Sequence, residues 1–390
     1  MPLLVKLRKL RDEIQQSAVG ISVGITSTLR AIEPTKIVVT SHHGTGYGCN
    51  PKYITEELLK ADDTRLDIVW LLKEYDSTMP SCIRQVKYGS RNAMKELATA
   101  RVWIDNCRIR RHVRKRKGQY YIQAWHGGTP LKLIEKDAED SLSKLYLYGA
   151  KRDGREADLM YANSDFMFDL IRNKFWYTGE IIRCGLPRNA PLFVDAAPIK
   201  ERVYEAFNID PEYQLCLYAP TFRDSHSLEP YVFDYARCCQ ALSERFGGKF
   251  AFAMRLHPNV AYLCKQYSDA NVIDVSSYGD AQELLVAADV LISDYSSITE
   301  DYALTGKPGY LYAPDFEDYM QERNMYFPLE KSAFPVAYDE GALLRNIANV
   351  TAEELEKKRT AYFKMIGMQD DGKGAERIAG IVLDVIKGAN

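Results

Sequence analysis

The most constraining feature of this chain is a short apolar strand followed by a loop and a helix, repeated along its length. In the first half, strands are expected at residues 36–41, 67–72, 101–105, 120–124 and 159–163. After a proline-containing stretch the rhythm resumes, with strands at residues 215–219, 250–256, 272–275, 290–293 and 309–312. Runs that are apolar on both faces are typical of parallel sheets covered by helices. The sequence therefore predicts an α/β fold of two Rossmann-like domains facing a cleft.

The repeat also suggests how the chain divides. With 390 residues it is long for one domain and suits two of ordinary size. The first domain is expected to span residues 36–190, and the second, with a helical tail, residues 191–390. In the preceding segment, residues 1–35, leucines at helical spacing predict a basic amphipathic helix carrying Lys6, Arg8, Lys9 and Arg11. Such a helix either packs on the first domain or docks on anionic lipid headgroups.

Composition narrows the class of protein. Hydrophobic residues make up 46% and charged residues 27% of the chain, as in globular proteins. We find no apolar run near the ~18 residues of a membrane-spanning helix, and no cleavable signal pattern. Eight cysteines without a C-x-x-C pair indicate reduced thiols in a cytoplasmic protein. The net charge is −2, and the basic run at residues 108–117 lacks interleaved aromatics, so we expect a solvated or phosphate-facing loop and no nucleic-acid partner.

The sharpest motif is Trp-His-Gly-Gly-Thr-Pro-Leu-Lys at residues 125–132, directly after a predicted strand. Glycines let backbone N–H groups approach an anion, and a helix N-terminus favours negative charge. An imidazole, with an ordinary pKa of ~6.5, can accept a proton near neutral pH. His126 is therefore a candidate base in a loop that also contains Gly127, Gly128, Thr129 and Lys132. The alternative is a buried structural histidine in a turn.

Two motifs in the second half repeat this placement. Arg255 and His257 come at the end of a predicted strand, where a guanidinium can chelate phosphate and an imidazole can donate to a leaving phosphate. Asp294, Ser296 and Ser297 follow another strand, and hydroxyls beside free helix N–H groups form an anion site. The alternatives are a capping histidine beside a surface arginine, and simple N-capping. Taken together, the two motifs favour one anion-binding site.

Other phosphate and metal signatures are weak. The glycine-rich turn at residues 44–48 does not match G-x-G-x-x-G, and the chain has no G-x-x-x-x-G-K-[ST] loop. The adjacent Cys238 and Cys239 lack the spacing of zinc ligands, and no carboxylate set indicates a metal site. We therefore expect no metal and no cofactor, with charge neutralised by His, Arg, Ser and helix dipoles.

Five ordered motifs resemble those of the CDP-glycerol glycerophosphotransferases of teichoic-acid and capsule synthesis, over about residues 36–350. The family pattern W-H-G-T-P-L-K resembles the His126 motif, which here has one extra glycine. G-x-P-R-N resembles residues 185–189, although Ala190 replaces a usual Asp. The other resemblances are Y-A-P-T-[WF]-R at residues 218–223, the second His motif at 255–258, and D-Y-S-S…D…KP at 294–297 with Asp301 and Pro308. Their order and spacing make the set specific.

The resemblance implies a GT-B-like transferase that needs no catalytic metal. It implies transfer of glycerol phosphate from CDP-glycerol to a hydroxyl of a lipid-linked glycan or polyol-phosphate acceptor, with release of CMP. The first domain would then face the acceptor, and the second would bind the CDP donor. The expected location is cytoplasmic, peripheral on the inner face of the cell membrane, with an anionic membrane surface as a further partner.

The resemblance also implies roles for single residues. His126 would take the acceptor proton, while Arg255 and His257 would stabilise charge on the diphosphate. The remaining donor contacts would come from Ser296 and Ser297 with Asp294 at the diphosphate, Asp301 at the ribose or cytidine, and Arg223 at a phosphate. The extra glycine would shift Thr129 and Lys132 along the loop more than His126.

Three alternatives stay open at this point. A CDP-ribitol ribitolphosphotransferase would keep the mechanism and change the polyol. A nucleotide-sugar glycosyltransferase or epimerase would share the architecture with another donor, and a non-catalytic protein would bind the nucleotide without releasing CMP. The acceptor glycan, primase or polymerase action and the oligomeric state are also left open by the sequence.

Overall fold

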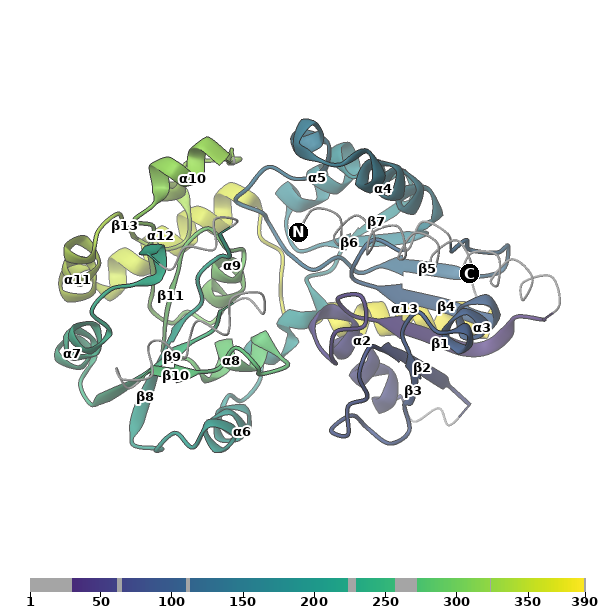
Figure 1. The fold of residues 1–390 in the computed structure, drawn as a ribbon, viewed down its shortest axis with the longest axis horizontal. Coiled ribbons are helices and arrows are strands. Elements are labelled where there is room, and N and C mark those ends of the chain that lie inside the picture. The colour runs from purple at the N-terminus through teal and green to yellow at the C-terminus, as the bar shows by residue number, and fades with distance from the viewer. Residues whose placement is uncertain are drawn as a thin grey trace, which may run out of the picture.

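The computed structural model describes residues 30–61, 65–109, 113–223, 229–256, 272–322 and 324–388. Within these ranges the chain forms two α/β units that lie side by side, each built on one parallel sheet (Figure 1). The predicted α/β fold of two Rossmann-like domains is thus confirmed.

The first sheet has seven strands in the order β3-β2-β1-β4-β5-β6-β7. Its strands are β1 (Glu33–Thr40), β2 (Asp67–Leu72), β3 (Arg84–Lys87), β4 (Ala100–Asp105), β5 (Tyr120–Gln123), β6 (Leu159–Ala162) and β7 (Glu180–Arg183). The helices of this unit are α2 (Cys49–Lys60), α3 (Arg91–Thr99), α4 (Lys144–Glu156) and α5 (Asp165–Lys174). Buried side chains fill both faces of this sheet, as expected for parallel strands.

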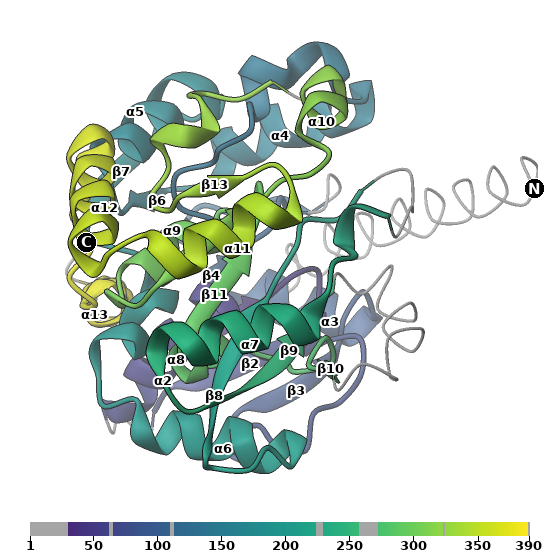
Figure 2. The ribbon, with the colours of Figure 1, turned by 90° about the vertical axis from the view of Figure 1, so that its left-hand side faces the viewer.

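The second sheet has six strands in the order β10-β9-β8-β11-β12-β13. They are β8 (Tyr213–Tyr218), β9 (Lys249–Met254), β10 (Val272–Asp274), β11 (Val290–Ser293), β12 (Gly309–Tyr312) and β13 (Val336–Ala337). Helices α7 (Tyr235–Phe246) and α11 (Glu340–Asn349) cover one face, as Figure 2 shows. The other helices are α6 (Ala197–Phe207), α8 (Ala281–Ala287), α9 (Ile298–Ala303), α10 (Phe316–Glu322) and α12 (Ala352–Ile366).

Strand order positions the site. In the first sheet the order reverses between β1 and β4, and in the second between β8 and β11. The loops beyond the carboxyl ends of strands at such a reversal leave a crevice, and ligands bind there in open α/β sheets. A ligand is therefore expected at the carboxyl ends of β1 and β4 or of β8 and β11.

The last helix does not stay with the second unit. After α12 the chain returns to the first unit, where α13 (Gly374–Lys387) lies against α2 and β4 (Figure 1). Its Ile378, Val382 and Val385 are buried in the core of the first sheet. The division between residues 190 and 191 remains a prediction. The predicted helical tail belongs to the second unit in sequence, but its last helix, α13, packs on the first unit.

Three strands did not emerge from the sequence: β3, β7 and β13. β3 reads Arg-Gln-Val-Lys and β7 reads Glu-Ile-Ile-Arg, and both lie at an edge of the first sheet. β13 has two residues and is the edge strand of the second sheet. Edge strands face water on one side and need no continuous apolar run, so their sequences lack the signal that identifies central strands.

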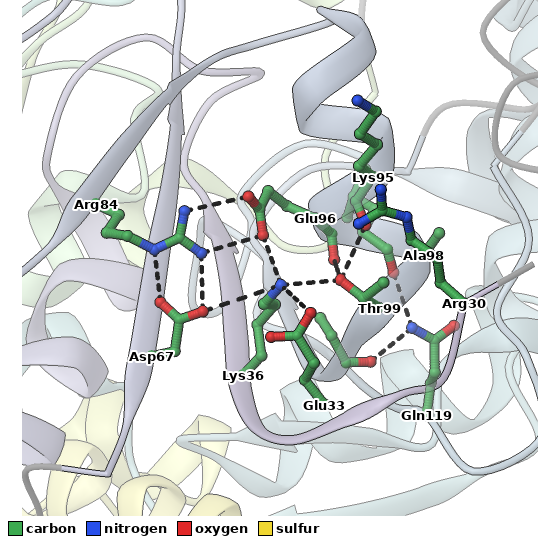
Figure 3. Close-up of polar contacts among 12 residues, drawn as sticks. Arg30, Glu33, Lys36, Asp67, Arg84, Lys95, Glu96, Ala98, Thr99 and Gln119 are labelled. Atoms are coloured by element: carbon green, nitrogen blue, oxygen red, sulfur yellow. Dashed lines mark hydrogen bonds and ion pairs between the residues drawn. The ribbon is translucent and has the colours of Figure 1, made fainter. Parts of the chain in front are cut away.

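A network of ion pairs joins β1, β2, β3 and α3 (Figure 3). Lys36, which is 5% exposed, lies within 2.8 Å of Glu96 and 2.7 Å of Glu33. Arg84 pairs with Asp67 at 2.7 Å and with Glu96 at 3.1 Å. The buried ammonium is therefore fully paired, as a buried charge must be.

The structure describes one of the two predicted basic segments only in part and the other hardly at all. The candidate amphipathic helix with Lys6, Arg8, Lys9 and Arg11 lies outside the described residues. In the run at 108–117, Arg108 is buried and pairs with Glu135 and Asp153, so this side chain does not belong to an open basic loop. None of the helices in the described ranges has the length and apolar character needed to cross a membrane.

Candidate active site

A cavity of about 480 Å³ lies where the two units meet. Its walls come from the loop after β5 in the first unit and from the loops after β8, β9 and β11 in the second. Its polar lining includes Lys132, Thr221, Arg255, Ser296 and Ser297. Among the described lining residues there are two cationic side chains and no carboxylate, so the cavity favours an anion, and its volume suits a small-molecule ligand.

His126 follows β5, and its accessible ring lies beside the rings of Trp125 and His42. Its Nδ1 lies 2.8 Å from the carbonyl oxygen of Asn106. Because a carbonyl only accepts, Nδ1 carries the proton, and Nε2 of the neutral ring has a lone pair. Surrounding protein displaces water and lowers the pKa of His126 to about 4, although the Asn106 hydrogen bond opposes this shift. The imidazole is therefore neutral at physiological pH and suited to act as a base.

Buried polar groups hold the His126 loop in place. Asn50 donates to the carbonyl oxygens of Ala124 and Trp125 at 2.9 and 3.0 Å. Arg188, from the segment 185–189, donates to the carbonyl oxygen of His126 at 2.6 Å. Trp125 has a φ of 43°, a left-handed conformation that is rare for a large side chain. Such strain persists only where neighbouring contacts fix the backbone, as they do here.

The extra glycine of this loop has a specific function in packing. A Cβ on Gly128 would lie 1.9 Å from Oε1 of Glu300 and 2.9 Å from Nδ2 of Asn163. A Cβ on Gly127 would meet only ordinary contacts, the nearest being Oγ of Ser297 at 3.6 Å. Gly128 therefore lets the first unit approach α9 of the second unit, and the same approach brings the backbone of Gly127 to Ser297.

Glu300 is the central group of this contact. Its carboxylate accepts hydrogen bonds from the Thr129 backbone N–H at 3.0 Å, from Asn163 at 2.7 Å and from Tyr362 at 3.0 Å. Burial raises the pKa of Glu300 to about 7, while the bonds from Asn163 and Thr129 favour the charged form. Thr129, predicted as part of the anion-binding loop, is buried and donates to this carboxylate.

Replacing Glu300 with glutamine is expected to change how stability depends on pH. The folded-state pKa is raised from 4.5 to about 7, so the wild type loses stability as pH rises through this interval. The full difference corresponds to roughly 3 kcal/mol. Glutamine does not titrate, so the gap in unfolding free energy between wild type and Glu300→Gln should change by up to that amount between about pH 5 and about pH 8. Denaturant titrations of both proteins measure this gap, and a constant gap would contradict the assignment.

On the second unit, Arg255 and the serine pair line the cavity, and their contact with a donor diphosphate stays a prediction. Arg255 donates to the Tyr278 carbonyl oxygen at 2.8 Å, which fixes its guanidinium beside the cleft. Burial lowers the pKa of Arg255, although Asp280 acts in the opposite direction. Ser296 and Ser297 line the same cavity at the start of α9. A half-buried guanidinium beside two hydroxyls offers several donors to a phosphate.

The structure departs from the prediction at Arg223 and Asp294, which are buried and do not belong to the described cavity lining. Arg223 is 5% exposed and pairs with Asp294 at 2.9 Å and Asp315 at 2.6 Å. Asp294 also accepts from the Thr221 backbone N–H at 2.8 Å and from its hydroxyl at 2.6 Å. Two carboxylates neutralise the guanidinium, so we correct the role of both residues from phosphate contact to support of the Thr221 loop.

Asp301 also differs from its predicted role at the ribose or cytidine. It is 1% exposed and pairs with Arg188 at 2.7 Å. Gln282 donates to the same carboxylate at 3.2 Å. Asp301 therefore acts through Arg188 on the His126 loop, because Arg188 bridges this carboxylate and the His126 carbonyl.

The remaining predicted residues have different outcomes. Lys132 lies at the cavity, and its backbone pairs with Met325 of the second unit. His257 lies outside the described residues, so its role stays a prediction. Within the described ranges, no group of three or more His, Cys, Asp or Glu residues is arranged to hold a metal ion.

Sequence reasoning missed four residues of this site: His42, Asn106, Arg188 and Glu300. His42 and Asn106 follow β1 and β4, at the point where the strand order reverses. The rule that identified His126, a polar residue after a predicted strand, would also have found His42. Arg188 lies in the motif at residues 185–189, which gave it no role, and both Arg188 and Glu300 act through contacts between segments far apart in the chain.

Comparisons with known proteins identify the family of this chain. Residues 23–384 match the family described as CDP-glycerol:poly(glycerophosphate) glycerophosphotransferase. The teichoic acid glycerol-phosphate transferase of Staphylococcus aureus is 28% identical over 383 residues, covering 92% of this chain and 95% of that protein. The teichoic acid poly(glycerol phosphate) polymerase of Staphylococcus epidermidis is 28% identical over 377 residues, covering 91% of this chain. This chain covers 51% of that polymerase, about half of its length.

A solved structure shares the whole architecture. A variant of the wall teichoic acid polymerase TagF superposes with a TM-score of 0.84 at 25% identity, covering 98% of this chain and 97% of that chain. The GT-B-like arrangement expected from the family resemblance is therefore confirmed. Teichoic acid ribitol-phosphate transferases are also similar to the chain, so the comparisons span two polyols.

Proposed function

The chain belongs to the CDP-glycerol:poly(glycerophosphate) glycerophosphotransferase family, and we propose that it transfers glycerol phosphate from CDP-glycerol to an acceptor hydroxyl and releases CMP. The observation that carries this proposal is the pairing of His126, a neutral imidazole on the first unit, with the cationic cavity around Arg255 on the second. Gly127, the residue after this base, lies beside Ser297 of the anion site, and a base next to an anion site suits phosphoryl transfer.

The donor would lie in the cavity with its diphosphate against Arg255, Ser296 and Ser297. Backbone and hydroxyl groups of the Thr221 loop, supported by Asp294, lie on the same wall. A TagF structure was obtained after a soak with CDPG, that is, CDP-glycerol, which supports binding of this donor. His257, two residues beyond Arg255, would add a further donor to the leaving phosphate.

The reaction would proceed by direct displacement. The acceptor oxygen attacks the phosphorus that bears glycerol, its proton passes to Nε2 of His126, and the bridging oxygen leaves on CMP. The free ring is a weak base because its pKa is about 4. A bound diphosphate brings negative charge near the ring and raises that pKa, so the base strengthens when the donor is present. Arg255 stabilises the charge that builds on the diphosphate. This electrostatic stabilisation contributes more to the rate than proton transfer to His126 does.

The acceptor would be a lipid-linked glycan or a polyol phosphate, as in the synthesis of teichoic acid or a capsule-type polymer. In this proposal the first unit faces the acceptor and the second binds the donor. The basic segment at residues 1–35 would bring the enzyme to an anionic membrane surface, peripheral on its inner face. CDP-ribitol is the second candidate donor, because ribitol-phosphate transferases are among the similar proteins.

A donor screen tests the proposal. CMP release would be measured with CDP-glycerol, CDP-ribitol or a UDP-sugar, with and without a lipid-linked disaccharide, in EDTA. We expect acceptor-dependent release from CDP-glycerol, unaffected by EDTA. CMP release from CDP-ribitol alone would show that the transferred polyol is ribitol, with the mechanism unchanged. UDP release from a UDP-sugar alone would contradict the proposal, and CDP-glycerol binding without CMP release would make the chain a binding protein.

A further inference from the structure

The β1–α2 loop carries a second imidazole at the cleft. His42 comes two residues after the end of β1, at the reversal of strand order in the first sheet. Its ring is accessible, and its centroid lies 6.0 Å from that of His126. The reversal is where open α/β sheets bind their ligands, and the ring of His126 lies beside this position.

One residue fixes the orientation of both rings. The backbone N–H of His42 donates to Oδ1 of Asn106 at 2.7 Å, which leaves the amide Nδ2 of Asn106 3.4 Å from Nε2 of His42. Since Nδ2 is a donor, Nε2 of His42 accepts, and the proton of the neutral ring is on Nδ1. The Asn106 carbonyl accepts from Nδ1 of His126. His126 thus offers a lone pair to the cleft, and His42 has an N–H to donate.

The charges of two arginines, one from each part of the proposed site, act on His42. Burial lowers its pKa to about 4, and the positive charges of Arg188 and Arg255 act in the same direction. His42 therefore lies near the base, near the arginine that orients the base, and near the arginine of the anion cavity. In the proposed reaction, the phosphorus under attack lies between the acceptor hydroxyl at His126 and the leaving group at Arg255.

The backbone of His42 is held in an uncommon conformation. Its φ is 43°, in the left-handed region, which is uncommon but which His, Asn and Asp tolerate better than most residues. The hydrogen bond from its N–H to Asn106 stabilises this conformation. Residues kept in sparsely populated regions cluster at active sites, where neighbouring contacts maintain them.

We infer that His42 is a further substrate contact, whose Nδ1–H donates to a non-bridging oxygen of the phosphoryl group being transferred. This inference rests on the proposed function and extends it to a residue outside the five recognised motifs. The bond stabilises charge on the equatorial oxygens during displacement, while the acceptor proton still goes to His126 and the bridging oxygen still leaves on CMP.

A matched pair of variants tests the inference. Asn at position 42 keeps an N–H near the place of Nδ1, whereas Asp has the same size and backbone tolerance but repels phosphate. We expect His42→Asn to retain kcat within about threefold, and His42→Asp to lower kcat about 10²-fold or more, the size of effect seen when a transition-state donor is lost. CMP lacks the transferred phosphoryl group, so its inhibition constant should be the same for both variants.

The outcomes separate this inference from the proposed function. Near-equal kcat for the two variants, in an enzyme whose wild type releases CMP from CDP-glycerol, would overturn the role of His42 alone. If His42→Asp weakens CMP binding by the same factor as it lowers kcat, the role of His42 is also overturned, because that result indicates a distorted nucleotide site. No CMP release by the wild type would overturn the proposed function, and the inference with it.

Discussion

Replacing His126 with asparagine is expected to lower kcat for CMP release by about 10²–10⁴-fold, the usual contribution of a general base. Asparagine can keep the hydrogen bond to the Asn106 carbonyl, now 2.8 Å from Nδ1, but it has no equivalent of the Nε2 lone pair. The variant should therefore fold normally and bind CDP-glycerol with unchanged affinity. Steady-state kinetics and calorimetric binding of the donor measure the two effects separately.

A small effect would be equally informative. If His126→Asn keeps kcat within about tenfold of the wild type, general-base catalysis by this residue is excluded, since that is below the usual range. A loss of donor affinity without a change in kcat would instead make His126 a binding residue. The pKa of about 4 makes the prediction demanding, because the free ring is a weak base and the bound donor must raise its pKa.

Replacing Gly128 with alanine is expected to reduce both stability and activity. The new Cβ would lie 1.9 Å from the Glu300 carboxylate, so either this buried side chain leaves its hydrogen bonds or the loop moves away from α9. Overpacking of this kind costs typically about 1–3 kcal/mol. His126 is two residues away, and a displacement of about 1 Å at a reacting group can reduce the rate about 10²-fold. Thermal unfolding and kcat of the same preparation measure both effects.

Two controls isolate the cause. Gly127→Ala adds the same methyl group one residue earlier, where the nearest atom is 3.6 Å away, and should leave stability unchanged within about 0.5 kcal/mol. In a Glu300→Ala background the obstructing carboxylate is gone, so Gly128→Ala should add little further loss. Additive losses in the double variant would show that the contact between Gly128 and Glu300 is not the cause.

The local parts of the fold could be predicted because each central strand is a buried apolar run. The same signal located His126, Arg255 and Ser296, since polar residues that directly follow such strands meet at one edge of a parallel sheet. Edge strands such as β3 lacked it because water covers part of their surface. Strand position is thus readable from sequence, whereas the direction of a side chain at a strand end is not.

Arg223 and Asp301 illustrate that limit. Both stand in motifs that mark the cleft, yet each pairs with an opposite charge distant in sequence, at Asp315 and Arg188. A charged residue near a ligand site either contacts the ligand or positions another residue, and local spacing is the same in the two cases. The contact of Gly128 with Glu300 is likewise non-local, which is why the extra glycine had no evident reason in the sequence.

The most direct test of the account is the mass of the acceptor after reaction. Wild-type protein and His126→Asn would be incubated with CDP-glycerol and a lipid-linked disaccharide, and the acceptor analysed by mass spectrometry alongside CMP. We expect the wild type to add one or more glycerol-phosphate units, each matched by one CMP, and His126→Asn to add far fewer in the same time. An unchanged acceptor in the presence of wild-type protein that binds CDP-glycerol would contradict it.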